Sequence, residues 1–274
     1  MLKMLTDSID LDFIRKTIPN ILFEVDGETP ISEKLAPFIA DASERLLADY
    51  LASDDFLNQA DRTIAQKYVV YTAFADAVPS LDIVATPTGF GVVSTETVAP
   101  ASKDRVERLI DSLRKRAESI LEILIERLRT YPQWRSSERG AYFCSTFLSN
   151  PRDVVATGAD SYENMRSEAL QAESFIARHF IGANLMKMLR NEYNARDSFM
   201  LLELHEAVRS AVLESVRLTF KNCIPNHNAI WRLIQPALHL LRNDAKYCRL
   251  WQEEMGILYD NLQFKNDVKG SFYF

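Results

Sequence analysis

The chain has 274 residues, of which 47% are hydrophobic and 26% are charged. This composition is typical of a folded globular protein with one large core or two modest ones. The 32 basic residues are outnumbered by 38 acidic ones, which gives a net charge of −6. A general nucleic-acid binder needs a cationic face, so this class is disfavoured, and we expect no direct sequence-specific contact with nucleic acid.

No targeting or membrane-spanning segment is indicated. No apolar run approaches the ~18 residues that suggest a membrane span. The N-terminus turns polar at Thr6-Asp7, too early for the apolar core of a signal peptide. The three cysteines, Cys144, Cys223 and Cys248, are odd in number and lack the CxxC spacing of a zinc site. We therefore expect free thiols, no membrane partner and a location in the bacterial cytoplasm.

Three helices are predicted in the N-terminal half by apolar residues that recur every three or four positions. They are expected over residues 31–50, 60–78 and 103–130, and Pro79 is expected to end the second. We expect the apolar stripe of the third helix to face the core of the bundle. This stripe consists of Val106, Leu109, Ile110, Leu113, Ala117, Ile120, Leu121, Leu124 and Leu128.

Residues 80–101 interrupt the helical pattern. β-Branched residues are frequent in two short runs joined by Pro87-Thr88-Gly89, which predicts a β-hairpin or an extended excursion. An isolated hairpin is only marginally stable in water, so it must pack on the helices or on another subunit. The apolar candidates for a partner interface are Phe90, Val92, Val93 and Val98. Two alternatives stay open: an arm that docks on a neighbouring subunit, and a clasp over the chain's own long helix.

The C-terminal half is predicted to be helical after an irregular connection over residues 135–160, where Ser, Gly and an Asn-Pro pair are frequent. Helices are expected over residues 162–193, 198–220 and 229–251. The fold class is therefore mostly α, a helical bundle divided into residues 1–134, the connection 135–160 and residues 161–274. The chain ends in Phe272, Tyr273 and Phe274. Because free termini normally fray, these aromatics suggest docking on the body or on a partner.

Short sequence matches suggest that the two halves are pseudo-repeats of one three-helix unit. Three pairs of segments come in the same order in both halves. Phe38-Ile39-Ala40 matches Phe175-Ile176-Ala177, Phe74–Pro79 matches Phe220–Pro225 in form, and Arg108-Leu109-Ile110 matches Arg232-Leu233-Ile234. Each match spans only three or six positions, so chance similarity is the alternative.

The sequence contains no recognisable catalytic, cofactor-binding or metal-binding motif, so we assign no residue to these roles and expect no cofactor. No GxxxxGK[ST] loop, GxGxxG fingerprint or GxSxG elbow occurs. His205-Glu206 begins like a zinc-protease motif, but Arg209 occupies the position of the second histidine. No histidine follows a glutamate by three residues, as di-iron bundles require. We expect solvated or hydrogen-bonded roles for all four, which are His179, His205, His227 and His239.

Paired carboxylates are the remaining candidates for acid–base chemistry. Most of them occur where helix ends or solvated faces ordinarily carry charge, and catalysis would require an environment that separates their pKa values. The pairs are Asp10/Asp12, Asp54/Asp55, Glu203/Glu206 and Glu253/Glu254.

The densest basic run is Arg114-Lys115-Arg116, in the middle of the third predicted helix. Acidic residues lie beside this run on the same helix, among them Asp111, Glu118 and Glu122. We therefore expect these cations to form i,i+4 ion pairs on a solvated helix face.

One segment resembles a known family. Residues Thr88-Gly89-Phe90-Gly91-Val92-Val93-Ser94-Thr95-Glu96, followed by Pro100-Ala101-Ser102 and Arg105-Val106, resemble a motif of an uncharacterised family from gut Bacteroidetes genomes and prophages. Members occur near phage head and tail genes. The resemblance thus implies a virion-associated structural component, similar to the helical adaptor or neck proteins that form the head–tail connector ring between portal and tail. The family has no assigned catalytic residues, so none is carried over.

Three functional hypotheses follow. The first is a non-enzymatic phage or prophage assembly protein that self-associates and contacts other virion proteins, such as a portal. The second is a helical ligand-binding protein or hydrolase whose acidic residues converge only in three dimensions. The third is a host scaffold or regulatory protein that binds a partner helix.

Overall fold

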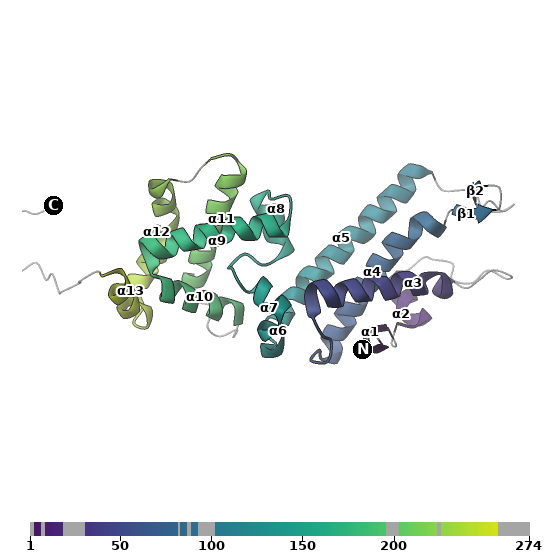
Figure 1. The fold of residues 1–274 in the computed structure, drawn as a ribbon, viewed down its shortest axis with the longest axis horizontal. Helices are drawn as coiled ribbons and strands as arrows, with labels where there is room; N and C mark the ends of the chain where they lie inside the picture. Colours follow the sequence, from purple (N-terminus) through teal and green to yellow (C-terminus); the bar gives the residue numbers. More distant parts are fainter. Residues whose placement is uncertain are drawn as a thin grey trace, which may run out of the picture. The chain divides into compact units, whose positions relative to one another are not determined.

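The fold was analysed in a computed structural model that describes residues 3–6, 9–18, 31–81, 83–86, 89–92, 102–195, 203–223 and 226–256. The chain forms two compact units. Unit 1 comprises Met1–Cys144 with Asn150–Arg152, and unit 2 comprises Ser145–Ser149 with Asp153–Phe274. Both units are helical bundles, as the sequence predicts (Figure 1).

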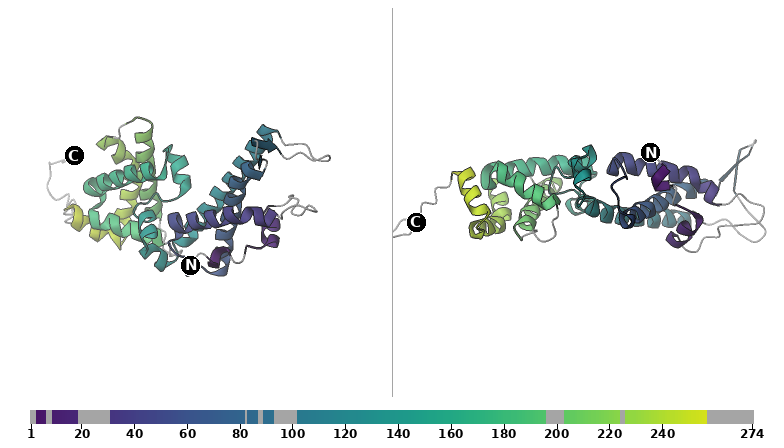
Figure 2. Two further views of the ribbon diagram at one scale, coloured as in Figure 1. Left: turned by 45° about the vertical axis from the view of Figure 1, so that its right-hand side comes forward. Right: turned by 90° about the horizontal axis from the view of Figure 1, so that it is seen from below.

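Unit 1 is built around two long helices that run side by side, α4 and α5 (Figures 1 and 2). The third long helix, α3, packs on α4, and the core lies among Leu46, Val69 and Leu124. The helices of this unit are α1 (Lys3–Thr6), α2 (Leu11–Thr17), α3 (Ile31–Leu46), the π-helix η1 (Leu47–Leu51), α4 (Gln59–Leu81), α5 (Lys103–Leu128), α6 (Pro132–Ser136) and α7 (Glu138–Phe143).

The second predicted helix does not end at Pro79. This residue lies inside α4, which continues to Leu81. A proline removes its own N–H and its ring crowds the carbonyl four residues earlier, and here both effects fall in the last turn, because only two residues of the helix follow Pro79.

The apolar stripe of α5 is buried over only part of its length. From Leu113 onward the stripe is in the core, with Leu121 and Leu124 almost inaccessible to solvent. Before Leu113 no residue of α5 is buried: Val106 and Ile110 are half-buried, the other eight residues of 103–112 are exposed, and Leu109 keeps 44% of its surface accessible.

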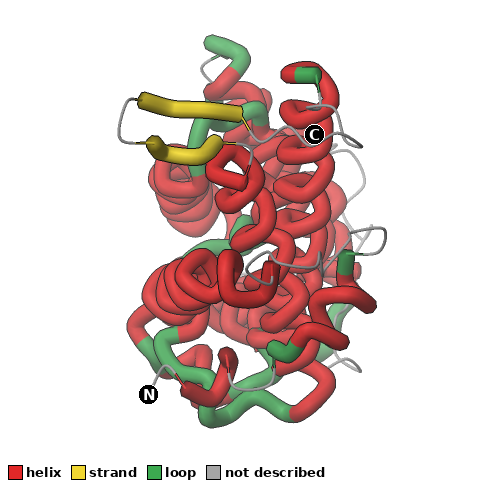
Figure 3. The backbone as a smooth tube through the Cα atoms, turned by 90° about the vertical axis from the view of Figure 1, so that its right-hand side faces the viewer, coloured by secondary structure: helices red, strands yellow, loops and turns green. Residues whose placement is uncertain are grey.

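Two short strands follow α4, β1 (Ile83–Thr86) and β2 (Gly89–Val92). They pair antiparallel, with Ile83 opposite Val92 and Thr86 opposite Gly89 (Figure 3). Residues 93–101, the remainder of the expected excursion, lie outside the described residues.

Unit 2 has a continuous hydrophobic core that includes Phe147, Ile181 and Leu241. Its helices are α8 (Pro151–Thr157), which begins at the boundary between the units, α9 (Tyr162–Ile176), the π-helix η2 (Ala177–Ile181), α10 (Ala183–Ala195), α11 (Glu203–Phe220), α12 (His227–Asn243) and α13 (Tyr247–Met255).

The expected irregular connection over residues 135–160 is wrong. Three short helices, α6, α7 and α8, occupy or enter this segment, and the first stretch of unit 1 ends within it, at Cys144. A serine caps a helix in this segment: the hydroxyl of Ser137 accepts the Gly140 N–H at 3.1 Å at the start of α7. Polar, glycine-containing sequence thus marks helix caps and tight helix packing in this segment. A Cβ at Gly140 would lie 1.7 Å from the carbonyl oxygen of Trp134.

Two of the predicted C-terminal helices are each divided in two. The helix expected over 162–193 breaks at Gly182, whose φ of 101° is open to glycine and strained for other residues. Glu254 caps the new helix, α10, because its carboxylate accepts the Asn184 and Leu185 N–H groups, each at 2.8 Å. The helix expected over 229–251 breaks at Asp244, which caps α13 by accepting the Tyr247 N–H at 3.0 Å.

The π-helices η1 and η2 end the first long helix of each unit in the same way. In unit 1 the indole N–H of Trp134 donates to the carbonyl of Tyr50, the fourth residue of η1, at 2.7 Å. In unit 2 the indole N–H of Trp251 donates to the carbonyl of Phe180, the fourth residue of η2, also at 2.7 Å. Carbonyls at a helix end lack an intrahelical partner, and each buried tryptophan supplies one.

A tyrosine close to each tryptophan makes a second matching contact. The hydroxyl of Tyr131 donates to Asp61 at 2.5 Å, and the hydroxyl of Tyr247 donates to Glu192 at 2.6 Å. Each carboxylate also has a cationic partner, Arg127 at 2.9 Å for Asp61 and Lys246 at 2.7 Å for Glu192. We call the tryptophan and tyrosine contacts of each unit its latch.

Candidate functional site

The interface candidates chosen from the sequence are only partly described by the structure. Phe90 and Val92 lie in β2, where their backbones pair with Ala85 and Ile83. The other candidates lie outside the described residues, namely Val93, Val98, Phe272, Tyr273 and Phe274. Their role as a partner interface stays a prediction.

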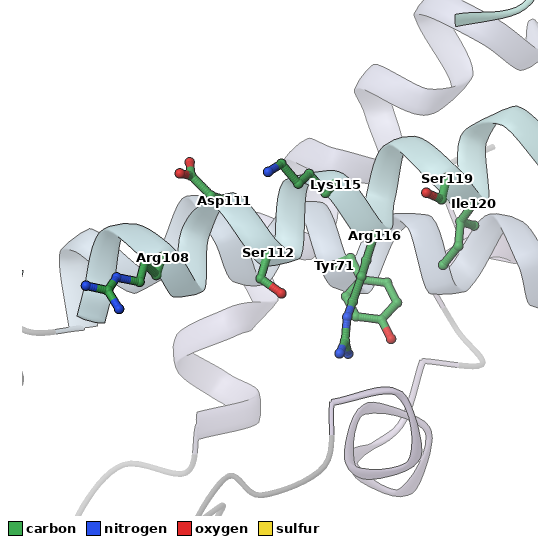
Figure 4. A pocket seen from close by; sticks show the side chains of 8 residues that line it. All are labelled: Tyr71, Arg108, Asp111, Ser112, Lys115, Arg116, Ser119 and Ile120. Atoms are coloured by element: carbon green, nitrogen blue, oxygen red, sulfur yellow. The ribbon is translucent and has the colours of Figure 1, made fainter. Parts of the chain in front are cut away.

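The structure draws attention to a different surface, an open hollow of about 630 Å³ along α5. Seven of its lining residues recur every three or four positions and therefore share one face of α5, and Tyr71 of α4 forms the side. Figure 4 shows the Arg116 guanidinium beside the Tyr71 ring. We call this the basic hollow; it is lined by Tyr71, Arg108, Asp111, Ser112, Lys115, Arg116, Ser119 and Ile120.

The cations of the basic hollow are not neutralised by ion pairs. Among the described residues no ion pair joins Arg108, Lys115 or Arg116 to an acid, so the expected i,i+4 pairing of the basic run is wrong. Arg116 instead lies over the Tyr71 ring, with 5.9 Å between its guanidinium carbon and the ring centroid. Glu122 pairs with Arg152 at 2.5 Å. Three cations against one acid leave the hollow with a formal charge of +2.

A shallow hollow of about 480 Å³ with the opposite charge lies on α3 and α4 of the same unit. It carries three carboxylates and one cation, a formal charge of −2, around the half-buried ring of Phe38. Arg45 forms an ion pair with Asp76 across the two helices. We call this the acidic face; it is lined by Phe38, Asp41, Glu44, Arg45 and Asp76.

Unit 2 has a third hollow, of about 530 Å³, between α9 and α10. Glu173 lies in its wall with only 3% of its surface exposed, accepting the Phe147 N–H at 2.7 Å and facing Arg190 at 3.2 Å. Burial raises the pKa of Glu173 to about 7, although the Phe147 N–H and Arg190 act in the opposite direction. The exposed cations Arg178 and Lys187 line the same hollow.

Three of the four carboxylate pairs lie at helix ends rather than together in these hollows, whereas Asp54 and Asp55 lie between η1 and α4, with Asp54 only 3% exposed. Asp10 caps α2 by accepting the Phe13 N–H at 2.7 Å. Glu254 caps α10, and Glu253 forms an i,i+4 pair with Arg249 at 2.8 Å. Glu203 and Glu206 lie in the first turn of α11, where carboxylates are stabilised by the helix dipole. This placement favours structural roles for these pairs.

The histidines hydrogen-bond or pack against other rings. His205 is fully buried, with Nε2 3.1 Å from the Glu192 carboxylate in the unit 2 latch. His239 lies 3.3 Å from the Asn243 amide, and the rings of His179 and His227 pack on Phe180. Within the described ranges, no group of three His, Cys, Asp or Glu side chains could hold a metal ion.

A search of the described residues for helices long and apolar enough to cross a membrane found none.

Comparison with known families gives one match. Residues 33–144 match the model of a family described as "Family of unknown function (DUF6712)". The match ends at Cys144, where the first stretch of unit 1 also ends, and it includes both the basic hollow and the acidic face. Comparisons with curated proteins and with solved structures found no significant match.

The sequence showed the cations of the basic hollow but not the hollow itself. Arg108, Ser112, Lys115 and Ser119 recur at helical spacing, which places them on one face. The missing information was tertiary: Tyr71 is 45 positions from Arg116, and only the packing of α4 on α5 brings their side chains together.

Proposed function

We propose that this chain is a non-enzymatic assembly protein of a phage or prophage, similar to a head–tail connector subunit, that acts through contacts with neighbouring subunits and with a portal. On this proposal it is virion-associated once assembled. The observation that carries the proposal is the first part of α5, where the exposed Leu109 lies beside Arg108, a cation that forms no ion pair with any described residue.

The exposed stripe supports a subunit contact because apolar side chains recur there at core spacing without being buried. Val106 and Ile110 are half-buried, and Leu109 is the most exposed of the three. Exposed apolar surface next to charged groups is typical of protein–protein interfaces. The same part of α5 carries Arg105 and Val106 of the phage-family resemblance.

The test is light scattering coupled to size-exclusion chromatography, on the full chain alone and mixed with a phage portal protein. We expect a multimer alone or a defined complex with the portal. A chain that stays monomeric at high concentration and elutes separately from the portal would exclude the proposal. Density for this chain in a virion would support it independently.

The unit 2 hollow favours a second candidate function, the binding of a small anionic molecule. The exposed Arg178 and Lys187 supply cationic groups, and a proton on Glu173 would reduce the negative charge beside them. Titration calorimetry with inorganic phosphate would test this candidate. Heat that disappears in Arg178→Ala and Lys187→Ala would support it, whereas no heat above dilution would exclude phosphate as a ligand.

We also propose that the two units arose by duplication of one helical unit, a hypothesis supported by the paired latches. In this pairing α3, α4, α5 and α6 correspond to α9, α11, α12 and α13, and α10 is an insertion. Two of the sequence matches fall at different structural positions. Phe38–Ala40 lies in the middle of α3 and Phe175–Ala177 at the end of α9; Phe74–Pro79 lies inside α4, whereas Phe220 ends α11.

The third match fits the pairing, because Arg108 and Arg232 are each the sixth residue of their helix. The test is superposition of the four paired helices in an experimental structure. The same order and direction would support duplication, and a different direction for any pair would exclude it.

A further inference from the structure

We propose that the basic hollow of one copy of this chain binds the acidic face of a second copy, so that copies join head to tail through unit 1. This inference rests on the proposed function and adds the two surfaces that make the subunit contact. Three features support it. The two surfaces have complementary charge, each has an apolar or aromatic centre, and their positions on the unit exclude a two-fold dimer.

The charges of the two surfaces are complementary. The basic hollow carries +2 and the acidic face −2, on a chain whose net charge is −6. For such an acidic chain a local excess of positive charge is unusual, and the acidic partner that it fits is present on the same unit. Complementary potentials speed encounter and fix the register of an interface. Asp111 inside the hollow would repel the phosphates of a nucleic acid, which favours a protein partner.

Each surface also has an apolar or aromatic centre. On the acidic face this is the ring of Phe38, and in the basic hollow it is Tyr71 with the half-buried Ile120. Aromatic and arginine side chains dominate binding energy at protein interfaces. We therefore expect Phe38 to pack beside Tyr71 and Ile120 of the next copy, with Asp41 and Glu44 facing Arg108 and Lys115.

The position of the two surfaces on α4 indicates the type of assembly. Tyr71 contributes to the basic hollow and Asp76 to the acidic face, and five residues of an α-helix correspond to a rotation of about 140°. The two surfaces therefore face away from each other. One partner cannot fill both at once, so the contact is heterologous and extends to a ring or a filament rather than a two-fold dimer.

The experiment is a charge swap on the full chain, followed by sedimentation velocity. The basic-hollow variant is Arg108→Glu with Lys115→Glu, and the acidic-face variant is Asp41→Lys with Glu44→Lys. We expect each variant to weaken self-association by at least about tenfold, because like charges then face each other. Carrying both pairs of changes in one chain should restore association. High salt should weaken the wild-type contact.

The matched control is Lys103→Glu with Arg114→Glu, which makes the same charge change on the opposite side of α5. The inference is supported if this control associates like wild type. Equal weakening by the control, failure of the double swap to restore association, or a discrete wild-type dimer would each overturn it. Loss of nucleic-acid binding without loss of self-association in the basic-hollow variant would also overturn it.

Failure of this inference can be separated from failure of the proposed function. A wild-type chain that is monomeric alone but forms a defined complex with the portal overturns the head-to-tail contact and leaves the assembly role supported. A wild-type multimer that ignores both charge variants overturns only the assignment of these two surfaces. Circular dichroism of every variant establishes that the helices are intact.

Discussion

The two units share a latch but differ in how much helix they leave exposed. In each unit a tryptophan caps a π-helix and a nearby tyrosine binds a carboxylate. The described helices of unit 2 have at most 18 residues and enclose a continuous core, whereas α5 of unit 1 has 26 residues and none of its first ten is buried. The latch residues therefore close each helical bundle, whereas the length of α5 determines how much helix lies outside the core of unit 1.

The largest losses of stability are expected from substitution of the glycine beside each latch. We expect Gly140→Ala to cost more than about 3 kcal/mol, because its Cβ would overlap the backbone of Trp134, which has no room to move. Gly182→Ala should cost less, about 2 kcal/mol, because its Cβ meets the flexible Glu254 side chain and its φ is strained. Denaturant unfolding measures both, and equal costs would contradict this ranking.

The buried carboxylate of Glu173 should make the stability of unit 2 depend on pH. Its pKa is raised to about 7 in the folded chain, so the folded state holds a proton that the unfolded state loses above about pH 4.5. As the pH rises from about 4.5 to about 7, the free energy of unfolding should therefore fall by about 3 kcal/mol in total. Above about pH 7 it should level off.

Hydrogen exchange measured by mass spectrometry across this pH range would locate the effect in unit 2. Glu173→Gln should remove this fall, while the exposed Glu203→Gln should keep it. A fall that persists in Glu173→Gln would assign it to another group.

Replacing the two tryptophans tests whether the latches are equivalent. Trp134→Phe and Trp251→Phe each remove an indole N–H and leave the carbonyl of Tyr50 or Phe180 without this donor. We expect a loss of about 2 kcal/mol in each case from the missing hydrogen bond and the smaller ring. Hydrogen exchange should speed up in unit 1 for the first variant and in unit 2 for the second. Faster exchange in both units from either variant would show that the latches are not independent.

The smallest expected effect distinguishes the tyrosines. Tyr131→Phe should cost about 1–2 kcal/mol because Asp61 is only 3% exposed and loses a partner that water does not replace. Tyr247→Phe should cost less than about 1 kcal/mol, since the side chain of Glu192 is 29% exposed and keeps Lys246. Thermal unfolding of the two variants gives the comparison, and a larger loss for Tyr247→Phe would reverse it.

Periodicity predicted most of the helices and little of what divides them. The stripes of α3, α4 and α5 were visible because amphipathic spacing reports which face meets a core. The break at Gly182 was missed because its cap, Glu254, lies about 70 residues away in sequence. The exposure of Leu109 was missed for a related reason: a stripe indicates that a face is apolar, but its partner depends on how far the neighbouring helix extends.

The same limit applied to the candidate site. Arg114–Arg116 was recognised as a basic run, and local spacing favoured ion pairs with nearby acids. In the fold, Arg116 instead lies over the Tyr71 ring, and Glu122 forms an ion pair with Arg152. Long-range partners therefore decided which cations stayed available.

The tryptophan caps have a consequence for the order in which the chain matures. Trp134 follows Tyr50 by 84 positions in the sequence, and Trp251 follows Phe180 by 71 positions. During synthesis the first long helix of each unit therefore lacks its tryptophan cap until the helix that carries the tryptophan has left the ribosome, and unit 1 can be completed before most of unit 2 has been translated.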